Sequence, residues 1–190
     1  MIRNLGWGGC LVDYAPVRPR TAVITGAPGA GKTTLLEILA TRGWRVVPEA
    51  ARAILREPGG MALRNDDPLG FTRAMIEREI AYLAAAPDDG RWTIFDRGFF
   101  DSIAFLNLSG SRASAMAVPP LRYSGPVFVA PAWAEIYHPD AERIQDWSEA
   151  QVSGDAVTAA WIAAGYALVA LPLGTPLERA EFVATTLGSN

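Results

Sequence analysis

Short apolar runs alternate with amphipathic segments along most of the chain. The run at 21–25 has few polar residues and is rich in β-branched ones, which is typical of a buried strand in a parallel sheet. Similar runs follow at 44–48, 92–96, 126–130 and 166–171. Strands that alternate with helices in this way predict an α/β fold. We expect a five-stranded parallel sheet with helices on both faces, in a three-layer sandwich.

Helical periodicity occupies most of the sequence between these runs. Helices are predicted at 32–41, 49–56, 67–86, 99–108, 148–164 and 175–187. The longest begins at Asp67-Pro68 and places an apolar stripe along one face. Its Met and aromatic side chains are therefore expected in the core and not in a base-stacking site. The segment 110–124 shows no such period and is predicted to be a loop, and 135–147 is a polar stretch.

The 190 residues are enough for one domain with a substantial core, which we assign to residues 20–190. Residues 1–19 are rich in Gly, Pro and aromatic residues and have no clear period. We interpret them as an N-terminal extension outside this domain. The extension is either partly disordered or attached to the surface through Trp7 and Tyr14.

A glycine-rich loop directly follows the first predicted strand. Its sequence matches the phosphate-binding pattern G-x-x-x-x-G-K-[ST] and reads Gly26-Ala27-Pro28-Gly29-Ala30-Gly31-Lys32-Thr33. Lys32 is the only lysine among 17 basic residues, so this position favours a compact ammonium group over the arginine fork. Backbone N–H groups from Gly26 to Thr34 are expected to bind the phosphates of ATP. Lys32 is expected between the β- and γ-phosphates, with the Thr33 hydroxyl on Mg²⁺.

Charged residues also follow the next three predicted strands. Glu49 and Arg52 come after the second strand, and Asp96 and Arg97 come after the third. Arg143 lies in the polar segment after the fourth strand. Parallel strands end at one edge of the sheet, where ligands bind, and isolated charges are costly to bury. We therefore expect these side chains to share one solvent-filled site.

Each of these residues has a functional and a structural interpretation. Glu49 is either the base for a substrate hydroxyl or a first-turn carboxylate near a helix dipole. Arg52, one turn later, either binds substrate or pairs with Glu49. Asp96 either orients Mg²⁺ or caps the following helix. Arg97 either contacts phosphate or substrate, or forms a structural salt bridge.

The polar segment 137–146 occupies the position of the mobile lid in a nucleotide kinase. A lid excludes water during phosphoryl transfer, and Arg143 would stabilise charge on the transferring group. The alternative is a solvated helix. His138, the single histidine, is assigned no role.

Four segments together resemble a family of small bacterial P-loop proteins labelled "AAA family ATPase" or "predicted ATPase". The segments are 25–34, Val47-Pro-Glu-Ala-Ala-Arg52, Ile94-Phe-Asp-Arg-Gly98 and 135–143, and the resemblance extends over 21–187. This family is similar to the ribosylnicotinamide-kinase domain of NadR and, more distantly, to deoxynucleoside and thymidylate kinases. The resemblance implies that Glu49 is the base, that Asp96 and Arg97 form the acidic–arginine pair, and that Arg143 is the lid arginine. A second lid arginine of such relatives is missing here, because Gln145 and Asp146 occupy its neighbourhood.

Composition bears on the partners and the compartment. The net charge is −3 with no basic tract, so a nucleic-acid partner is not indicated. No apolar run approaches the ~18 residues of a membrane span. Cys10 is the only cysteine, which rules out an internal disulfide and agrees with a cytoplasmic location. Nothing in the sequence indicates an oligomeric state.

These residues favour a kinase. It would transfer the γ-phosphoryl group of MgATP to a hydroxyl-bearing small molecule, such as a nucleoside, bound between Glu49 and Asp96. The main alternative is an ATPase that acts as a nucleotide switch or regulatory module with no phosphoryl acceptor. Loss of catalysis is disfavoured, because Lys32, Thr33 and Asp96 are all present. The identity of the acceptor is not predicted.

Overall fold

The centre of the protein is a five-stranded sheet in which all strands are parallel, in the order β5-β6-β4-β8-β9. The computed structural model describes residues 4–5, 11–12, 15–16, 19–110, 121–137 and 146–188. The predicted α/β fold is confirmed. The strands of this sheet are β4 (Thr21–Gly26), β5 (Arg45–Val47), β6 (Thr93–Asp96), β8 (Val127–Ala130) and β9 (Leu168–Ala170).

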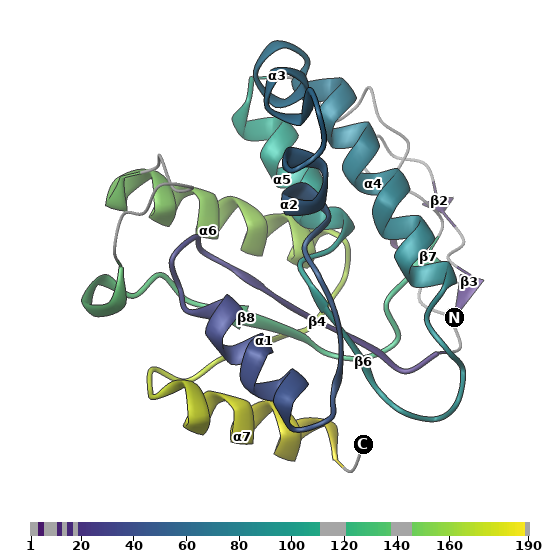
Figure 1. Cartoon of the computed structure of the whole chain (residues 1–190), viewed down its shortest axis with the longest axis vertical. Coiled ribbons are helices and arrows are strands. Elements are labelled where there is room, and N and C mark those ends of the chain that lie inside the picture. Colours follow the sequence, from purple (N-terminus) through teal and green to yellow (C-terminus); the bar gives the residue numbers. More distant parts are fainter. Residues whose placement is uncertain are drawn as a thin grey trace.

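Helices cover both faces of this sheet (Figure 1). One face carries α1 (Lys32–Thr41) and α7 (Pro176–Leu187). The other carries α4 (Pro68–Ala84), α5 (Phe99–Leu108) and α6 (Trp147–Ala163). A short 3₁₀ helix, η2 (Ala134–Ile136), follows β8.

Two short helices, α2 (Ala50–Leu55) and α3 (Gly60–Asp66), connect β5 to α4. The sequence did not predict α3, because Pro58-Gly59-Gly60 is typical of a helix end. Gly59 instead adopts a φ of 81° and becomes the N-cap of the next helix. Gly59 therefore allows the chain to turn sharply after α2 and to begin α3 at the next residue.

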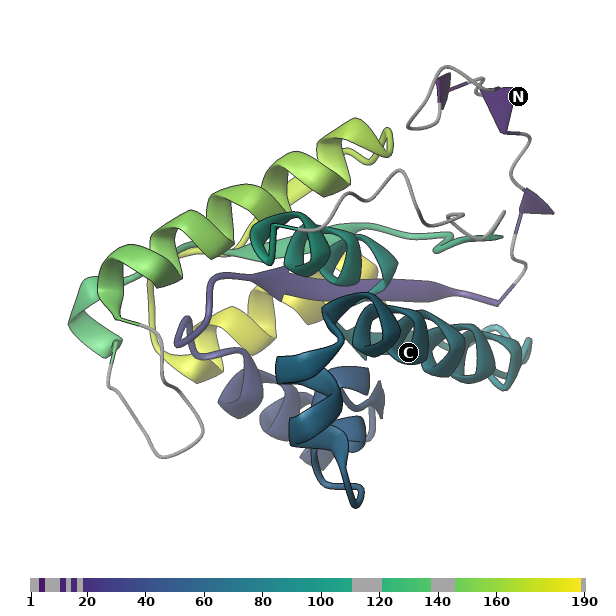
Figure 2. The same ribbon diagram turned by 90° about the horizontal axis from the view of Figure 1, so that it is seen from above.

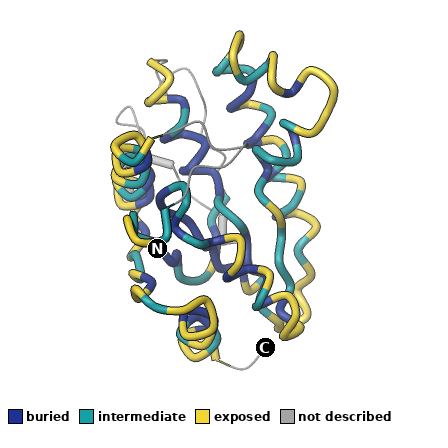
Figure 3. Tube along the Cα trace, turned by 60° about the vertical axis from the view of Figure 1, so that its left-hand side comes forward, coloured by how far each residue is buried: buried dark blue, intermediate teal, exposed yellow. Residues whose placement is uncertain are grey.

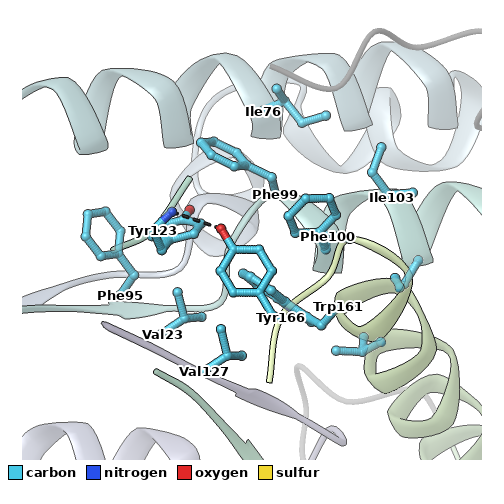
Figure 4. Packing of buried hydrophobic residues seen from close by; sticks show 14 of the residues in the cluster. Val23, Ile76, Phe95, Phe99, Phe100, Ile103, Tyr123, Val127, Trp161 and Tyr166 are labelled. Carbon is cyan, nitrogen blue, oxygen red and sulfur yellow. Dashed lines mark hydrogen bonds between the residues drawn. The ribbon is translucent and has the colours of Figure 1, made fainter. Parts of the chain in front are cut away.

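Successive residues of the central strand pack into two separate cores. Ala22 and Ile24 face α1 and α7, whereas Val23 faces α5 and α6. Figure 3 shows buried residues concentrated in the interior of the protein and exposed residues on the outer helix surfaces, and β4, β6 and β8 are the most deeply buried strands. In the core on the side of α5 and α6, Tyr166 lies among aromatic rings. Its hydroxyl accepts a 2.9 Å hydrogen bond from the backbone N–H of Tyr123 (Figure 4). Tyr166 was predicted to lie in the last strand but precedes it.

Four short strands lie outside the main sheet. β1 (Asn4–Leu5) pairs antiparallel with β2 (Leu11–Val12), and β3 (Ala15–Pro16) pairs parallel with β7 (Leu121–Arg122). β7 lies in a segment that was predicted to be a loop. Figure 2 shows β3 at the opposite end of the sheet from the glycine-rich loop. The described residues do not include Trp7, Cys10, Tyr14, His138, Arg143 and Gln145.

Candidate active site

The glycine-rich loop leaves the central strand β4 and enters α1. Gly26, Gly29 and Gly31 have φ values of 118°, 74° and 73°, a region that side-chain-bearing residues rarely adopt. A Cβ atom on Gly26 would lie 2.1 Å from the carbonyl oxygen of Ala130 in the neighbouring strand β8. The path of the loop therefore requires glycine where β4 ends.

Lys32 is the first residue of α1, and its side chain turns back over the loop. The ammonium Nζ donates hydrogen bonds to the carbonyl oxygens of Gly26 (3.2 Å) and Ala27 (2.6 Å). Burial lowers the pKa of Lys32 to about 7, and the nearby positive charge of Arg97 acts in the same direction. A bound anion would favour the charged ammonium form, because opposite charges stabilise each other.

One cavity of about 870 Å³ brings the predicted site residues together. Residues of the loop and apolar side chains of α4 and α5 both line it. All the charged residues singled out from the sequence that the structure describes lie along its walls: Lys32, Glu49, Arg52, Asp96 and Arg97. The structure thus brings these five residues together around one cavity.

Arg97 lies at the centre of the charged group. Its Nε is 3.1 Å from one oxygen of Glu49, and its terminal nitrogen is 2.8 Å from Asp101. Arg52 contacts the other oxygen of Glu49 at 3.1 Å. Burial opposes the charge of Arg97, but the carboxylates of Glu49 and Asp101 outweigh it and raise its pKa. Both arginines thus form the ion pairs that were one of the two interpretations of the sequence.

Asp101 was missed by the sequence analysis. This buried carboxylate of α5 accepts hydrogen bonds from the Thr25 hydroxyl (2.5 Å), the Gly98 N–H (3.2 Å) and the Trp161 indole (2.9 Å), in addition to Arg97. Its many donors fix its position, and it in turn orients the guanidinium group of Arg97. The available signal was an acidic residue inside the otherwise apolar segment 99–108.

Asp96 is the last residue of β6 and does not cap α5, whose N-cap is Gly98. Its Oδ1 atom is buried and has no hydrogen-bond partner among the described residues. Burial, followed by the charge of Glu49, raises the pKa of Asp96 to about 6. The structural interpretation of Asp96 as a helix cap is therefore wrong.

The unpaired oxygen of Asp96 and the exposed hydroxyl of Thr33 line the same cavity. Oxygen atoms of this kind are the ligands that Mg²⁺ prefers, and Mg²⁺ usually takes only one or two of them from protein. Within the described residues no group of three or more His, Cys, Asp or Glu side chains is placed to hold a metal ion. The site fits a magnesium ion that completes its shell with phosphate and water.

Arg179 of α7 is a second residue that the sequence analysis missed. It is 2% exposed and donates a 2.7 Å hydrogen bond to the carbonyl oxygen of Ala30 in the loop. Its Nε has no hydrogen-bond partner within the described part of the chain, and burial lowers its pKa. The hydrogen bond from Arg179 thus connects α7 to the glycine-rich loop.

A parallel sheet whose central strand runs into a G-x-x-x-x-G-K-T loop and helix defines a P-loop NTPase. A family described as "AAA domain" matches residues 21–179. The chain therefore belongs to this AAA domain family. No curated protein matches the chain in sequence.

Solved structures of kinases share the fold. A structure of NadR in complex with NR aligns with a TM-score of 0.65 and 17% identity, covering 91% of this chain and 53% of NadR. Deoxyadenosine kinase from M. mycoides, with the products dCMP and dCDP, aligns with a TM-score of 0.59 and 14% identity, covering 88% of this chain and 98% of the kinase. The chain thus spans about half of NadR. Family and fold together place it among the P-loop kinases and ATPases, which bind nucleotides.

Within residues 19–110, 121–137 and 146–188, no helix is long and apolar enough to cross a bilayer.

Proposed function

We propose that this protein is a kinase that transfers the γ-phosphoryl group of MgATP to a hydroxyl group of a nucleoside-like small molecule. One observation carries this proposal. The cavity of about 870 Å³ is lined by the phosphate loop and Glu49 and also by side chains of α2, α4 and α5. A nucleotide switch needs no space beyond the nucleotide, whereas a kinase needs room for an acceptor beside the phosphates. The fold similarity to NadR bound to NR and to deoxyadenosine kinase supports an acceptor of this size.

Glu49 is proposed to act as the base. Arg97 and Arg52 each hold one of its oxygens, so the carboxylate is fixed in the wall of the cavity that the phosphate loop also lines. It would take the proton of the acceptor hydroxyl while that oxygen bonds to the γ-phosphorus and the bond to ADP breaks. A positioned base of this kind contributes typically ~10²–10⁴-fold to the rate.

Lys32 and Arg97 are proposed to stabilise the negative charge of the transferring group. Thr33 and Asp96 would hold Mg²⁺, which supplies additional positive charge at the phosphates. Backbone N–H groups of residues 26–34 would hold the phosphates themselves. Arg143 remains a proposed lid residue, and residues 1–19 remain a proposed extension to the domain 20–190. We also retain the cytoplasmic location as a proposal.

The test compares ADP release from MgATP with and without each compound of a nucleoside panel. A kinase accelerates ADP release only with its acceptor, whereas a switch shows no acceptor dependence. Glu49→Gln preserves the shape of the side chain and should keep ATP affinity, measured by titration, while lowering acceptor phosphorylation at least ~10²-fold. Glu37→Gln, an exposed change on α1, is the matched control.

The switch interpretation predicts the opposite pattern. No compound would accelerate ADP release, and Glu49→Gln would leave basal ATP hydrolysis unchanged. That pair of results would replace the kinase proposal with a nucleotide switch.

A further inference from the structure

The wall of the cavity also holds a buried polar pair outside the ion pairs of Arg97. Glu79 of α4 is 5% exposed and lies on the buried face of its helix, in line with Met75 and Leu83. Its Oε1 accepts a hydrogen bond from the Ser102 hydroxyl of α5 at 3.3 Å. Its Oε2 has no hydrogen-bond partner among the described residues, and both Glu79 and Ser102 line the cavity.

A carboxyl group in this position is costly for the fold. Burying a polar group without a full set of hydrogen bonds destabilises the folded state, and an apolar residue would continue the stripe of α4 without that cost. A half-satisfied buried acid at the wall of a cavity therefore points to a ligand that completes its hydrogen bonds.

The surroundings of this pair are apolar and aromatic. Phe71, Met75 and Phe105 line the same cavity, and the two rings pack edge to face with centroids 5.5 Å apart. Phe71 and Met75 of the long helix were expected to belong to the core, and they do so while also forming part of the cavity wall. Apolar walls with a few convergent polar groups are typical of sites for flat ring ligands.

We propose that Glu79 and Ser102 recognise the hydrogen-bonding edge of a planar heterocyclic ring carried by the acceptor. Phe71, Met75 and Phe105 supply the apolar contact with that ring. This inference rests on the proposed function, because the ring belongs to the molecule whose hydroxyl group would be phosphorylated. Binding of the ring to Glu79 and Ser102 can be measured separately, without the phosphoryl-transfer reaction.

The charge state of Glu79 defines which ring edge it accepts. Burial, followed by the carboxylate of Asp101, raises the pKa of Glu79 well above its ordinary value; Glu49 adds to this, whereas the Ser102 hydrogen bond and Arg97 oppose it. The phenol of Tyr123, which faces the same region, also has a raised pKa. The direction of this shift favours the protonated form of Glu79, which has one O–H donor and one acceptor oxygen side by side.

Such an acid is complementary to an adjacent acceptor and donor, as in a carboxamide or the edge of a nucleobase. It disfavours a ring that presents a carboxylate, because that charge would be buried near the carboxylates of Asp101 and Glu49. The preferred ligand class is therefore a neutral-edged nucleoside. The same ring with an acid in place of the amide is expected to bind more weakly.

The test uses the common ribonucleosides and deoxyribonucleosides together with nicotinamide riboside and nicotinic acid riboside. Binding is measured by calorimetry without ATP, and KM is measured by ADP release with MgATP. We expect at least one neutral nucleoside to bind, and Glu79→Leu to weaken it about 10- to 100-fold. Glu77→Leu, an exposed change on the same helix, should not affect binding. If nicotinamide riboside binds, nicotinic acid riboside should bind at least tenfold more weakly.

Glu79→Gln separates recognition from packing, because it keeps one donor and one acceptor but cannot ionise. Wild-type affinity should fall at alkaline pH as Glu79 loses its proton, whereas Glu79→Gln should bind within a few-fold of wild type with a flat profile. If circular dichroism shows that Glu79→Leu does not fold, the pH dependence of binding by wild type and Glu79→Gln tests the proposal in its place. A Glu79→Gln profile that falls like that of wild type would overturn the proposal.

The two proposals can fail separately. Binding that depends on Glu79 without any acceleration of ADP release would refute the kinase and keep the ring site. Acceptor-dependent ADP release with an unchanged KM in Glu79→Leu would refute the ring site and keep the kinase. If no compound of the panel binds at millimolar concentration, the ring site is refuted.

Discussion

Lys32 is the only lysine of the chain, and the structure places its Nζ against two carbonyl oxygens of the loop. Burial lowers its pKa to about 7, so the ammonium is poorly stabilised before an anion arrives. A bound phosphate would replace the weak dipoles of Gly26 and Ala27 with full negative charge. This explains why an ammonium, a point charge on a flexible stem, suits the position better than the planar arginine fork.

Lys32→Ala and Lys32→Arg should both lower phosphoryl transfer while leaving the fold intact. Loss of one such charge contact typically costs ~10²–10³ in rate, and the guanidinium fork is too wide for the space between the loop carbonyls. Single-turnover kinetics and circular dichroism check the two parts of the prediction. Near-normal turnover of the arginine variant would contradict it.

Asp101 accepts hydrogen bonds from four groups, so we expect its charge to matter for stability. Asp101→Asn keeps the shape but presents an amide N–H₂ group to donors and leaves Arg97 short of a partner. Removing one member of a buried ion pair costs about 3–5 kcal/mol. Urea unfolding should show a loss of this size, together with a higher KM for any acceptor that depends on Arg97.

Glu181→Gln is the control for Asp101→Asn. Glu181 pairs with Arg42 at the surface, where both side chains are exposed. Its substitution should leave the unfolding midpoint unchanged. Equal effects of the two substitutions would show that Asp101 is an ordinary ion-pair partner.

At the scale of elements, the periodic pattern located most helices and all five strands of the main sheet. α1 and α5 begin and end at the predicted residues, because a glycine-rich turn and a strand end define their starts. α3 was missed because Gly59 and Gly60 give the same local signal whether a helix ends or begins. At two adjacent glycines, the local sequence does not show which backbone conformation the packing of the folded protein will select.

The candidate site was predictable where charges follow strands, and not where partners come from distant elements. Asp101 receives donors from Thr25 and Trp161, which are 76 and 60 residues away in sequence. Glu79 lies in the apolar stripe of α4, and only the position of α5 brings Ser102 to it. These contacts depend on how helices pack on the sheet, which a single sequence does not encode in a readable local pattern.

Arg179→Leu should weaken ATP binding although Arg179 does not line the nucleotide cavity. The substitution removes the hydrogen bond that holds the carbonyl of Ala30, so the loop must be ordered by the ligand itself. We expect about a tenfold loss of affinity by titration. Arg42→Leu, on the exposed side of the α1–α7 contact, is the control and should bind ATP normally.

At the scale of the whole molecule, a ligand that binds only the folded state stabilises it by RT ln(1 + [L]/Kd). MgATP at a hundredfold excess over Kd should add ~2.7 kcal/mol to the free energy of unfolding. MgATP should raise the melting temperature of the wild type, and EDTA should remove part of this thermal shift. Thr33→Ala and Asp96→Asn should lack that same part of the shift. A shift that EDTA leaves unchanged would show that the magnesium assignment is wrong.

The hydrogen bond from Arg179 to Ala30 also bears on how the protein matures on the ribosome. Synthesis completes the glycine-rich loop early, whereas Arg179 is added almost 150 residues later. A nascent chain that ends before α7 has the whole phosphate-binding sequence and all five strands of the main sheet, but lacks this support. We expect it to bind ATP poorly until the last helix emerges. Nucleotide binding would then begin only after the last helix has been synthesised.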